Sequence, residues 1–379
     1  MSWPMVKLGD VAPATPVKNV NLNKDELIWQ LNLDQIESNT GKVIDKIKQP
    51  LSKAGSSTHL FNNEHVLYSK LRPYLNKIII PDELGIATTE LVPMKPDQKR
   101  LNKKYLAYYL RSKQFVDWIS TQVSGAKMPR VVMSIFWQHE MPLPPLAEQE
   151  RIVAILDKAN EILHKRKKIK KLADDFLDAT FLAMFGDPVV NDKKWSIKKL
   201  NDICDNVVDC PHSTPKWVDD GIICVRTSNL SKGGWVWSDS RFVNNETYLE
   251  RTKRSVVEKG DIILSREGTV GVAAIVPENL KLCMGQRLVQ LKLDKNQVTP
   301  EYLLAFLLYE LDPLRISRVM SGSTSKHINV SELRQLDVMV PPMREQKLFS
   351  EIRKKIINIY NKPDIDSSLF EALSFQLTS

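Results

Sequence analysis

The chain has 379 residues, of which 42% are hydrophobic and 26% charged, so it has the composition of a folded protein with room for two or three domains, not that of a disordered segment. Its formal net charge of +9 indicates a polyanionic partner, although many soluble basic proteins have a similar charge. No segment reaches the roughly 18 consecutive apolar residues of a membrane span, and the first residues lack the apolar core of a secretory leader. We therefore expect a cytoplasmic protein.

The first globular unit is expected over residues 1–147. Strand-like stretches occur at residues 66–69 and 77–80, and a helical pattern of apolar residues runs from about 102 to 121. This mixture predicts a mixed α/β domain.

A long amphipathic helix, the central spacer helix, is expected over residues 148–187. From Ile152 onward, seam positions recur at alternating intervals of three and four, which is the pattern of a coiled coil, and only Arg166 and Thr180 interrupt its apolar character. A helix of about 36 residues would be roughly 54 Å long, because each residue adds 1.5 Å. The Gly-Asp-Pro sequence at residues 186–188 should end it.

The same organisation recurs in the second half of the chain. The Pro-Pro pair at residues 144–145, followed by Glu-Gln at 148–149, reappears at 341–342 and 345–346, an offset of 197 residues. Other pairs at this offset are Tyr105 and Tyr302, Leu110 and Leu307, and Ser124 and Ser321. A period of this length is that of whole domains and not that of a solenoid. We therefore expect an equivalent unit over residues 188–344.

A second spacer helix is expected over residues 345–379. When the first seam positions are shifted by 197 residues they fall on apolar residues, and the seam resumes near Phe370. Pro363 falls at the position of Arg166 and should break or kink this helix, at a cost of about 3 kcal/mol. The expected seam residues of the two helices are Ile152, Ile155, Ala159, Ile162, Ile169, Phe176, Phe349, Ile352, Ile356 and Ile359.

Matched seams favour pairing of the two helices with each other. Antiparallel packing would bury both seams and relate the two units by a pseudo-twofold axis. In the alternative, each helix packs on its own unit, but a domain of about 145 residues has a radius of gyration of only roughly 15 Å, so a helix this long would overhang it. The predicted fold is therefore mixed α/β, with two pseudo-repeated α/β units separated by two long antiparallel helices that form a coiled-coil spacer.

Sequence motifs of catalysis are absent. The sequence lacks the phosphate loop GxxxxGK[ST], the dinucleotide fingerprint GxGxxG and the nucleophile elbow GxSxG. It also lacks the Asn/Asp-Pro-Pro-aromatic tetrad of an amino-methyltransferase, since the Pro-Pro pairs follow Leu143 and Val340. The four cysteines have no CxxC spacing and the six histidines are scattered, so neither predicts a metal site. We expect no catalytic residue, no metal and no cofactor bound by this chain.

Paired loops of the two units instead contain the residue types that bind DNA. Loops at residues 69–74 and 124–130 match loops at 265–269 and 321–327 under the repeat. Arginine and lysine bind phosphates or guanine edges, and serine and threonine bind either, although any one such loop is more often a solvated turn. The candidate DNA-binding residues are Lys70, Arg72, Lys127, Arg130, Ser213, Thr214, Lys216, Arg226, Arg266, Thr269, Arg287, Lys326 and His327.

These features together resemble a known family. Leu143–Ile152 with its weaker copy Val340–Lys347, the run Met184–Pro188, and the loops His212–Lys216 and Ser265–Thr269 are similar to sequences in the specificity subunits of Type I restriction-modification systems. The order of domain, helix, domain and helix is similar as well.

The resemblance implies a non-catalytic chain in which two target-recognition domains each read one half of a split, asymmetric DNA site. The helices would set the length of the unread gap. The implied partners are double-stranded DNA, two methyltransferase subunits that bind S-adenosylmethionine, and restriction subunits that use ATP and magnesium, with no membrane. From the residues alone, the main alternative is a free-standing sequence-specific DNA-binding protein without a methyltransferase partner.

Overall fold

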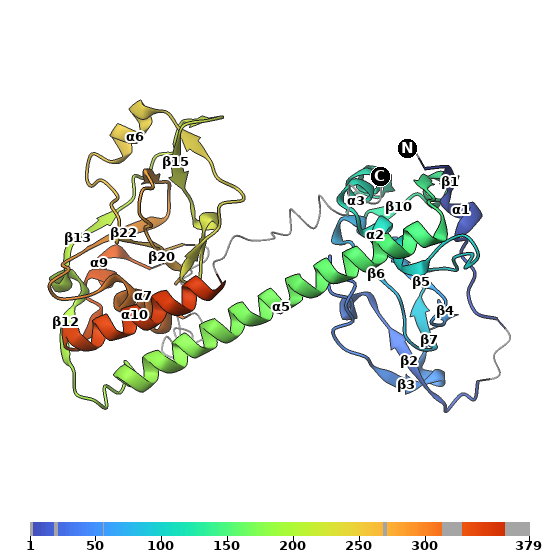
Figure 1. Ribbon diagram of the computed structural model, residues 1–379, viewed down its shortest axis with the longest axis horizontal. Coiled ribbons are helices and arrows are strands. Elements are labelled where there is room, and N and C mark those ends of the chain that lie inside the picture. Colours follow the sequence, from blue (N-terminus) through green and yellow to red (C-terminus); the bar gives the residue numbers. More distant parts are fainter. Residues whose placement is uncertain (1–2, 19–21, 56, 268–270, 313–327, 361–379) are drawn as a thin grey trace. The chain divides into compact units, whose positions relative to one another are not determined.

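The computed structural model describes residues 3–18, 22–55, 57–267, 271–312 and 328–360. The chain divides into two compact units, over Met1–Lys167 and Lys168–Lys362. Each unit mixes strands with helices, which confirms the predicted α/β character (Figure 1). Within the described ranges, no helix has both the length and the apolar character that crossing a membrane requires.

The first unit is built from short strands and short helices. In chain order these are β1 (Met5–Lys7), α1 (Leu8–Val11), β2 (Leu27–Leu31), β3 (Lys48–Pro50), β4 (Thr58–Phe61), β5 (Val66–Ser69), β6 (Ile78–Ile79), β7 (Gly85–Thr88), β8 (Leu91–Met94), α2 (Lys103–Arg111), α3 (Lys113–Thr121), β9 (Val123–Ser124), β10 (Arg130–Val131), α4 (Met133–Gln138), β11 (Glu140–Pro142) and the start of α5 (Leu146–Phe185). Strands β6-β5-β8 form one sheet and β3-β2-β7-β4 another, in which β2 and β7 are parallel.

The helix predicted over residues 102–121 is in fact two helices. Ser112 has an extended backbone (φ −61°, ψ 145°) that ends α2, and its hydroxyl caps α3 by accepting a hydrogen bond from the N–H of Phe115 at 3.3 Å. Serine is a preferred N-cap residue, because its side chain can replace a missing backbone acceptor. The prediction of one continuous helix was wrong, since apolar residues continue on both sides of the break.

The second unit repeats this plan. Its elements are the end of α5, then β12 (Ser196–Lys199), β13 (Cys204–Asp209), β14 (Trp217–Val218), β15 (Ile222–Val225), β16 (Leu230–Ser231), β17 (Gly234–Trp235), β18 (Phe242–Val243), α6 (Asn245–Arg251), β19 (Ile262–Ser265), β20 (Ala273–Ile275), β21 (Leu282–Met284), β22 (Leu288–Leu293), α7 (Pro300–Glu310), α9 (Val330–Arg334), β23 (Asp337–Val340) and α10 (Met343–Tyr360). Strands β13-β22-β19-β20 form one sheet and β14-β18-β15-β21 another.

Strand pairing repeats between the units, at offsets of 192 to 197 residues. Strand β5 pairs with β8 so that Val66 lies opposite Met94, and β19 pairs with β22 so that Ile262 lies opposite Leu291. Strand β1 pairs with β11 as β12 pairs with β23. The parallel pair β2–β7 also has a counterpart in β15–β21, where the two sequences diverge. The duplication of the fold therefore extends further than the duplication of the sequence.

The Pro-Pro and Glu-Gln motif connects the long helix to the first unit through a fully buried glutamine. The amide nitrogen of Gln149 donates to the carbonyl oxygens of Arg100 and Pro144, both at 2.8 Å. Its amide oxygen accepts from the N–H of Asn102, the N-cap residue of α2, at 2.8 Å. One side chain thus joins the first turn of α5 to the start of α2.

The second copy of the motif makes the same connection in the second unit. Gln346 is fully buried and donates to the carbonyl oxygens of Gln297 at 3.1 Å and Pro341 at 2.8 Å. It accepts from the N–H of Thr299 at 2.9 Å, and Thr299 caps α7 as predicted. The repeat that is most visible in the sequence is therefore a repeated structural connection.

Helix α5 is continuous over 40 residues, Leu146–Phe185, which corresponds to about 60 Å at 1.5 Å per residue. It ends at Gly186, as predicted, where φ is +79° and the N–H binds the carbonyl oxygen of Leu182 at 2.8 Å. Its first turns bury Ile152 in the core of the first unit. Its last turns bury Phe181 in the core of the second.

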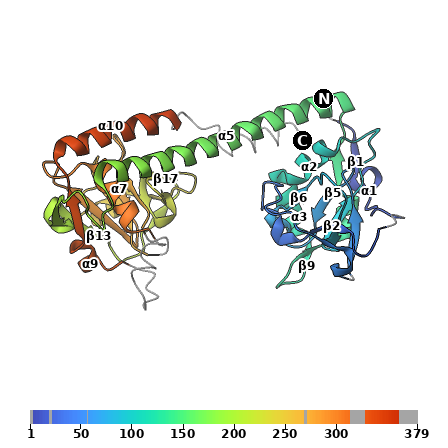
Figure 2. The same ribbon diagram turned by 90° about the horizontal axis from the view of Figure 1, so that it is seen from below.

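In the second unit, α10 lies beside the last turns of α5 (Figures 1 and 2). The ring of Phe349 in α10 lies 5.9 Å from that of Phe181 in α5. One turn further along α10, Arg353 lines a small cavity together with Asp178 and Asp174, which precede Phe181 in α5. The two helices therefore run antiparallel here, as predicted.

The predicted seam residues lie in three different environments. Buried ones are Ile152, Ala159 and Phe349; half-buried ones are Ile155, Ile162, Ile352 and Ile356; exposed ones are Ile169, Phe176 and Ile359. The two most buried of them, Ile152 and Phe349, pack in the cores of their own units. These two positions therefore follow the alternative in which each helix packs on its own unit. Pairing of the exposed positions stays a prediction, because Pro363 and Phe370 lie outside the described residues.

Candidate nucleic-acid interface

The strands of the second unit bring three segments to one edge of a sheet. In the order β13-β22-β19, Asp209 at the end of β13 lies opposite Val289, and Ser265 at the end of β19 lies opposite Leu288 at the start of β22. The chain therefore leaves this edge at residues 210–216 and 266–267 and enters it at 285–287. These three segments are termed the second-unit edge.

The segment after β13 presents polar side chains. Ser213, Thr214 and Lys216, all candidate DNA-binding residues, are exposed. The segment begins at Cys210, which is fully buried and whose sulfur accepts a hydrogen bond from the N–H of Leu288 at 3.4 Å. Burial raises the pKa of the Cys210 thiol, so this anchor is neutral at physiological pH.

Two predicted arginines of this edge have opposite surroundings. The side chain of Arg266 is 11% exposed, and its Nε lies 3.3 Å from Oδ1 of Asp209, without the alignment of a hydrogen bond. The side chain of Arg287 is 62% exposed, and its Nε lies 3.3 Å from Oε2 of Glu267. An exposed pair of this kind contributes only about 0–1 kcal/mol, so Arg287 can exchange its carboxylate for a phosphate or a base edge. Arg266 is instead buried within the edge, where its positive charge compensates the negative charge of Asp209.

The remaining candidates of the second unit lie around the same edge or outside the described residues. Arg226 follows β15 in the other sheet, and its guanidinium lies 2.6 Å from a carboxylate oxygen of Asp239. Thr269, Lys326 and His327 are outside the described residues. Ile328 is the first described residue after His327, and its N–H donates to the carbonyl oxygen of Arg266 at 2.8 Å.

The first unit gathers three of its candidates by backbone hydrogen bonds. Lys70 and Arg72 follow β5, and Arg130 begins β10 of the β9–β10 hairpin. The N–H of Arg72 donates to the carbonyl oxygen of Pro129 at 2.8 Å, and the N–H of Val131 donates to that of Lys70 at 2.9 Å. The hairpin and the stretch after β5 are termed the first-unit edge.

Side chains at the first-unit edge are mostly exposed. Arg72, Lys127 and Arg130 are exposed and Lys70 is half-buried. The Nε of Arg130 lies 3.0 Å from Oε1 of Glu90, in the turn between β7 and β8. Arg130 is therefore held by a weak surface pair, as Arg287 is in the second unit.

The two edges use opposite charges at one equivalent position. Glu90 and Arg287 are related by the 197-residue offset, and both lie just before the strand that pairs with β5 or β19. A carboxylate only accepts hydrogen bonds and a guanidinium only donates them, so the two edges present different hydrogen-bonding groups at this position.

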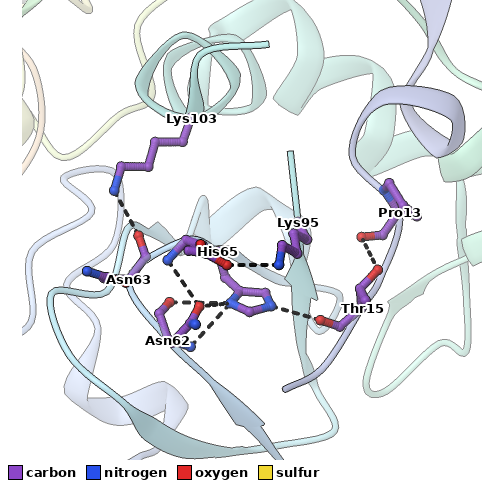
Figure 3. A network of polar contacts seen from close by, with 8 residues as sticks. Pro13, Thr15, Asn62, Asn63, His65, Lys95 and Lys103 are labelled. Carbon is purple, nitrogen blue, oxygen red and sulfur yellow. Dashed lines mark hydrogen bonds and ion pairs between the residues drawn. The ribbon is translucent and has the colours of Figure 1, made fainter. Parts of the chain in front are cut away.

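A buried histidine, His65, binds the stretch around Thr15, which precedes β2 in the first unit (Figure 3). His65 is 1% exposed; its Nδ1 lies 2.7 Å from Oδ1 of Asn62, and its Nε2 lies 2.8 Å from the carbonyl oxygen of Thr15. The histidine thereby ties the turn between β4 and β5 to the stretch around Thr15. It acts as a structural connector between these two segments.

Sequence reasoning missed the residues that support these edges. Asp209, Glu267 and Glu90 carry the partner charges, and only Glu267 had a visible signal, since it follows Arg266 directly. Arg251 and Gln286 bind the backbone of the segment after β13 and have no signal in the sequence, because their partners there are 38 to 74 residues away.

Comparisons with known proteins agree with a duplicated specificity chain. The family model described as "Type I restriction modification DNA specificity domain" matches residues 2–173 and again 192–366. The "Type I restriction enzyme MjaVIII specificity subunit" of Methanocaldococcus jannaschii is 25% identical over 294 residues, which cover 73% of this chain and 68% of the relative.

Two solved structures have a similar fold. The S subunit of the Type I restriction-modification system from M. genitalium matches with a TM-score of 0.55 and 14% identity, over 100% of this chain and 96% of the other. A chain from a study of complex assembly and conformational transition of the type I R-M system matches with a TM-score of 0.54 and 18% identity, over 99% of this chain and 97% of the other. At these identities the likeness concerns the fold alone.

Proposed function

Because the chain belongs to the family of Type I restriction modification DNA specificity domains, we propose that each of its two units reads one half of a split, asymmetric DNA site. It is a specificity subunit, and such a subunit is not the catalytic component of its system. Family membership thus favours one part of a larger complex over the free-standing DNA-binding protein that the residues alone left open.

The observation that carries this proposal is that both edges contain the equivalent segment after β5 or β19, among different side chains. Each edge presents exposed basic residues held only by weak surface pairs, Arg130 with Glu90 and Arg287 with Glu267. Exposed arginines and lysines among small polar residues can bind phosphates and read bases in the major groove. Equivalent placement supports a shared function, and the exchanged charge at Glu90 and Arg287 supports different half-sites.

The spacer helices are proposed to set the gap between the half-sites. Helix α5 leaves Ile169, Leu172 and Phe176 exposed at intervals of three and four residues, although each is large and apolar. Such a stripe is expected to pack against the matched seam of the second helix. A rigid spacer on the scale of one DNA turn, about 34 to 36 Å, would keep two readers at a fixed number of base pairs.

The partners are inferred from the family, which assembles into restriction-modification complexes. We infer that two methyltransferase subunits dock on this chain, bring S-adenosylmethionine and methylate adenine. Restriction subunits would add ATP- and magnesium-dependent chemistry. This chain would contribute the choice of DNA site and the scaffold, and it needs no cofactor of its own for either task.

The proposed function is tested by expressing the full chain together with its methyltransferase partner and mapping methylated adenines across a host genome. The expected result is one motif with two defined parts and a fixed unread gap, which disappears when this chain is omitted. If a stable complex formed but methylation were the same with and without the chain, the proposal would be wrong.

A further inference from the structure

The segment after β13 is bound by a buried arginine of another element, α6. Arg251 is the last residue of α6 and is 5% exposed. Its Nε donates to the carbonyl oxygen of Met284 at 2.7 Å, Nη1 to that of Ser213 at 3.1 Å, and Nη2 to that of Pro211 at 3.2 Å. Its guanidinium therefore joins the end of β21 in one sheet to the segment that follows β13 in the other.

A second side chain binds the carbonyl group of the residue that lies between Pro211 and Ser213. The amide nitrogen of Gln286 donates to the carbonyl oxygen of His212. Three consecutive carbonyl groups, at residues 211–213, thus accept hydrogen bonds from side chains of the protein. Ordinary turns leave such groups to the solvent or to their own backbone.

This arrangement decides which way the segment faces. With the carbonyl groups directed toward Arg251 and Gln286, the side chains of His212, Ser213 and Thr214 are exposed. Pro215, directly after them, is buried and holds the far end. A proline also has a fixed φ, which reduces the conformations open to the segment.

Arginine is suited to this task in a way that lysine is not. Its guanidinium has five N–H donors in a planar, rigid fork, so Nε, Nη1 and Nη2 of Arg251 can bind three different carbonyl groups at once. An ammonium group is a compact point charge and could not span the distance from Met284 to both Pro211 and Ser213 in the same geometry.

We propose that Arg251 is a positioning residue for DNA recognition by the second unit, and that it acts by presenting His212, Ser213 and Thr214 toward DNA. The inference rests on the proposed function of that unit as a DNA reader. Arg251 itself is too buried to touch DNA, so its effect passes through the segment, by its carbonyl groups and by Oγ of Ser213, to which Nη1 also donates at 3.5 Å.

The effect is expected at one half-site only. In the first unit the stretch around Thr15 is held by other groups: Nε2 of His65 lies 2.8 Å from the carbonyl oxygen of Thr15 (Figure 3), and the N–H of Thr15 donates to the carbonyl oxygen of Pro93 at 3.0 Å. Arg251 lies in the second unit and binds residues of that unit alone. A change at Arg251 should therefore leave the first half-site as it is.

The test uses the full chain expressed with its methyltransferase partner and compares methylation maps of Arg251→Met, Arg251→Lys and Arg254→Met. Arg254 is exposed and three residues away, so it controls for the loss of a positive charge. In Arg251→Met, discrimination at the second unit's half-site should fall about tenfold per base pair read by the segment, with the first half-site unchanged. Arg251→Lys should recover part of the loss and Arg254→Met should match the wild type.

A second readout follows the segment itself. Lys216 is exposed, so cleavage after it by a lysine-specific protease reports opening of the segment, and the rate should rise at least about tenfold in Arg251→Met but not in Arg254→Met. Should Arg251→Met not accumulate as folded protein, Arg251→Lys and Gln286→Ala decide, since Gln286→Ala removes only the bond to His212.

An unchanged second half-site in the folded Arg251→Met chain, or in both Arg251→Lys and Gln286→Ala, would overturn the inference. A change at both half-sites would overturn it as well, because the residue would then support the whole fold. If the wild-type chain itself directed no split motif, the failure would lie with the proposed function and not with Arg251.

Discussion

Gln149 satisfies three backbone groups at the junction of α5 with the first unit, so its replacement by leucine should destabilise that unit. Leucine has a similar size but leaves the N–H of Asn102 and two carbonyl groups without partners. We expect Gln149→Leu to lower the free energy of unfolding by about 2–4 kcal/mol, measured by urea unfolding of the full chain. Gln114→Leu, on an exposed position of α3, is the matched control, and equal midpoints for the two variants would contradict the assignment.

Arg266 and Arg287 should respond differently to the same substitution. Arg266→Met removes the guanidinium from the half-buried carboxylate of Asp209 and leaves it only the imidazole of His212 at 3.2 Å, so we expect a loss of about 1–3 kcal/mol in unfolding free energy. Arg287→Met removes only an exposed pair with Glu267 and should change stability by less than about 1 kcal/mol. Urea unfolding of both variants checks this, and a larger loss for Arg287→Met would show that the roles are reversed.

At the scale of elements, the contact between each spacer helix and its unit is repeated with its charges exchanged. Lys104 of α2 pairs with Asp157 of α5 at 2.6 Å, and at the equivalent positions Glu301 of α7 pairs with Lys354 of α10 at 3.2 Å. The same helix packing is therefore compatible with either polarity.

The charge arrangement of the second unit can be introduced into the first unit by substitution. Asp157→Lys should destabilise the first unit by losing both Lys104 and the hydroxyl of Tyr108, which donates to Oδ1 of Asp157 at 2.7 Å. Adding Lys104→Glu, which gives this pair the polarity found in the second unit, should recover only the part of the loss that is due to the pair with Lys104. A double-mutant cycle on unfolding free energies is expected to give a coupling of about 0.5–1 kcal/mol, as for other exposed pairs. A coupling of zero would mean that the pair does not contribute to holding α5 on α2.

Much of the element order could be predicted from periodicity and capping residues. The strand at 66–69, the cap at Thr299 and the end of α5 at Gly186 were correct because each depends on local chemistry. The break at Ser112 was missed because both flanking helices bury apolar residues with the same period. Periodicity reports burial, and it does not report where the backbone changes direction.

The candidate site was predictable only in part. Basic residues such as Lys70 and Arg266 could be found because they lie in loops that the duplication repeats. Arg251 could not, because its partners are carbonyl groups of residues far away in the sequence, and backbone atoms leave no trace in composition. The sequence does not distinguish Arg266 from Arg287, whereas the structure shows that the side chain of Arg266 is buried and that of Arg287 is exposed.

For the whole molecule, the length of the spacer helices should set the gap in the DNA site. Inserting seven residues after Ile162 in α5 and after the equivalent Ile359 in α10 adds roughly 10 Å to each helix, which corresponds to about three base pairs. Methylation mapping should then give a gap longer by about three base pairs, with both half-sites unchanged. Insertion into α5 alone should abolish methylation because the seams no longer match, and a normal gap in the double insertion would rule out the helices as its determinant.

The central claim is that each unit reads its own half of the site, and the most direct measurement compares methylation maps of two double variants in the full complex. One variant changes the first-unit edge, by Arg72→Ala with Arg130→Ala, and the other changes the second-unit edge, by Lys216→Ala with Arg287→Ala. Each is predicted to relax one half-site, a different one for each variant, while the gap stays constant. Relaxation of both half-sites by either variant, or of neither by both, would contradict the account.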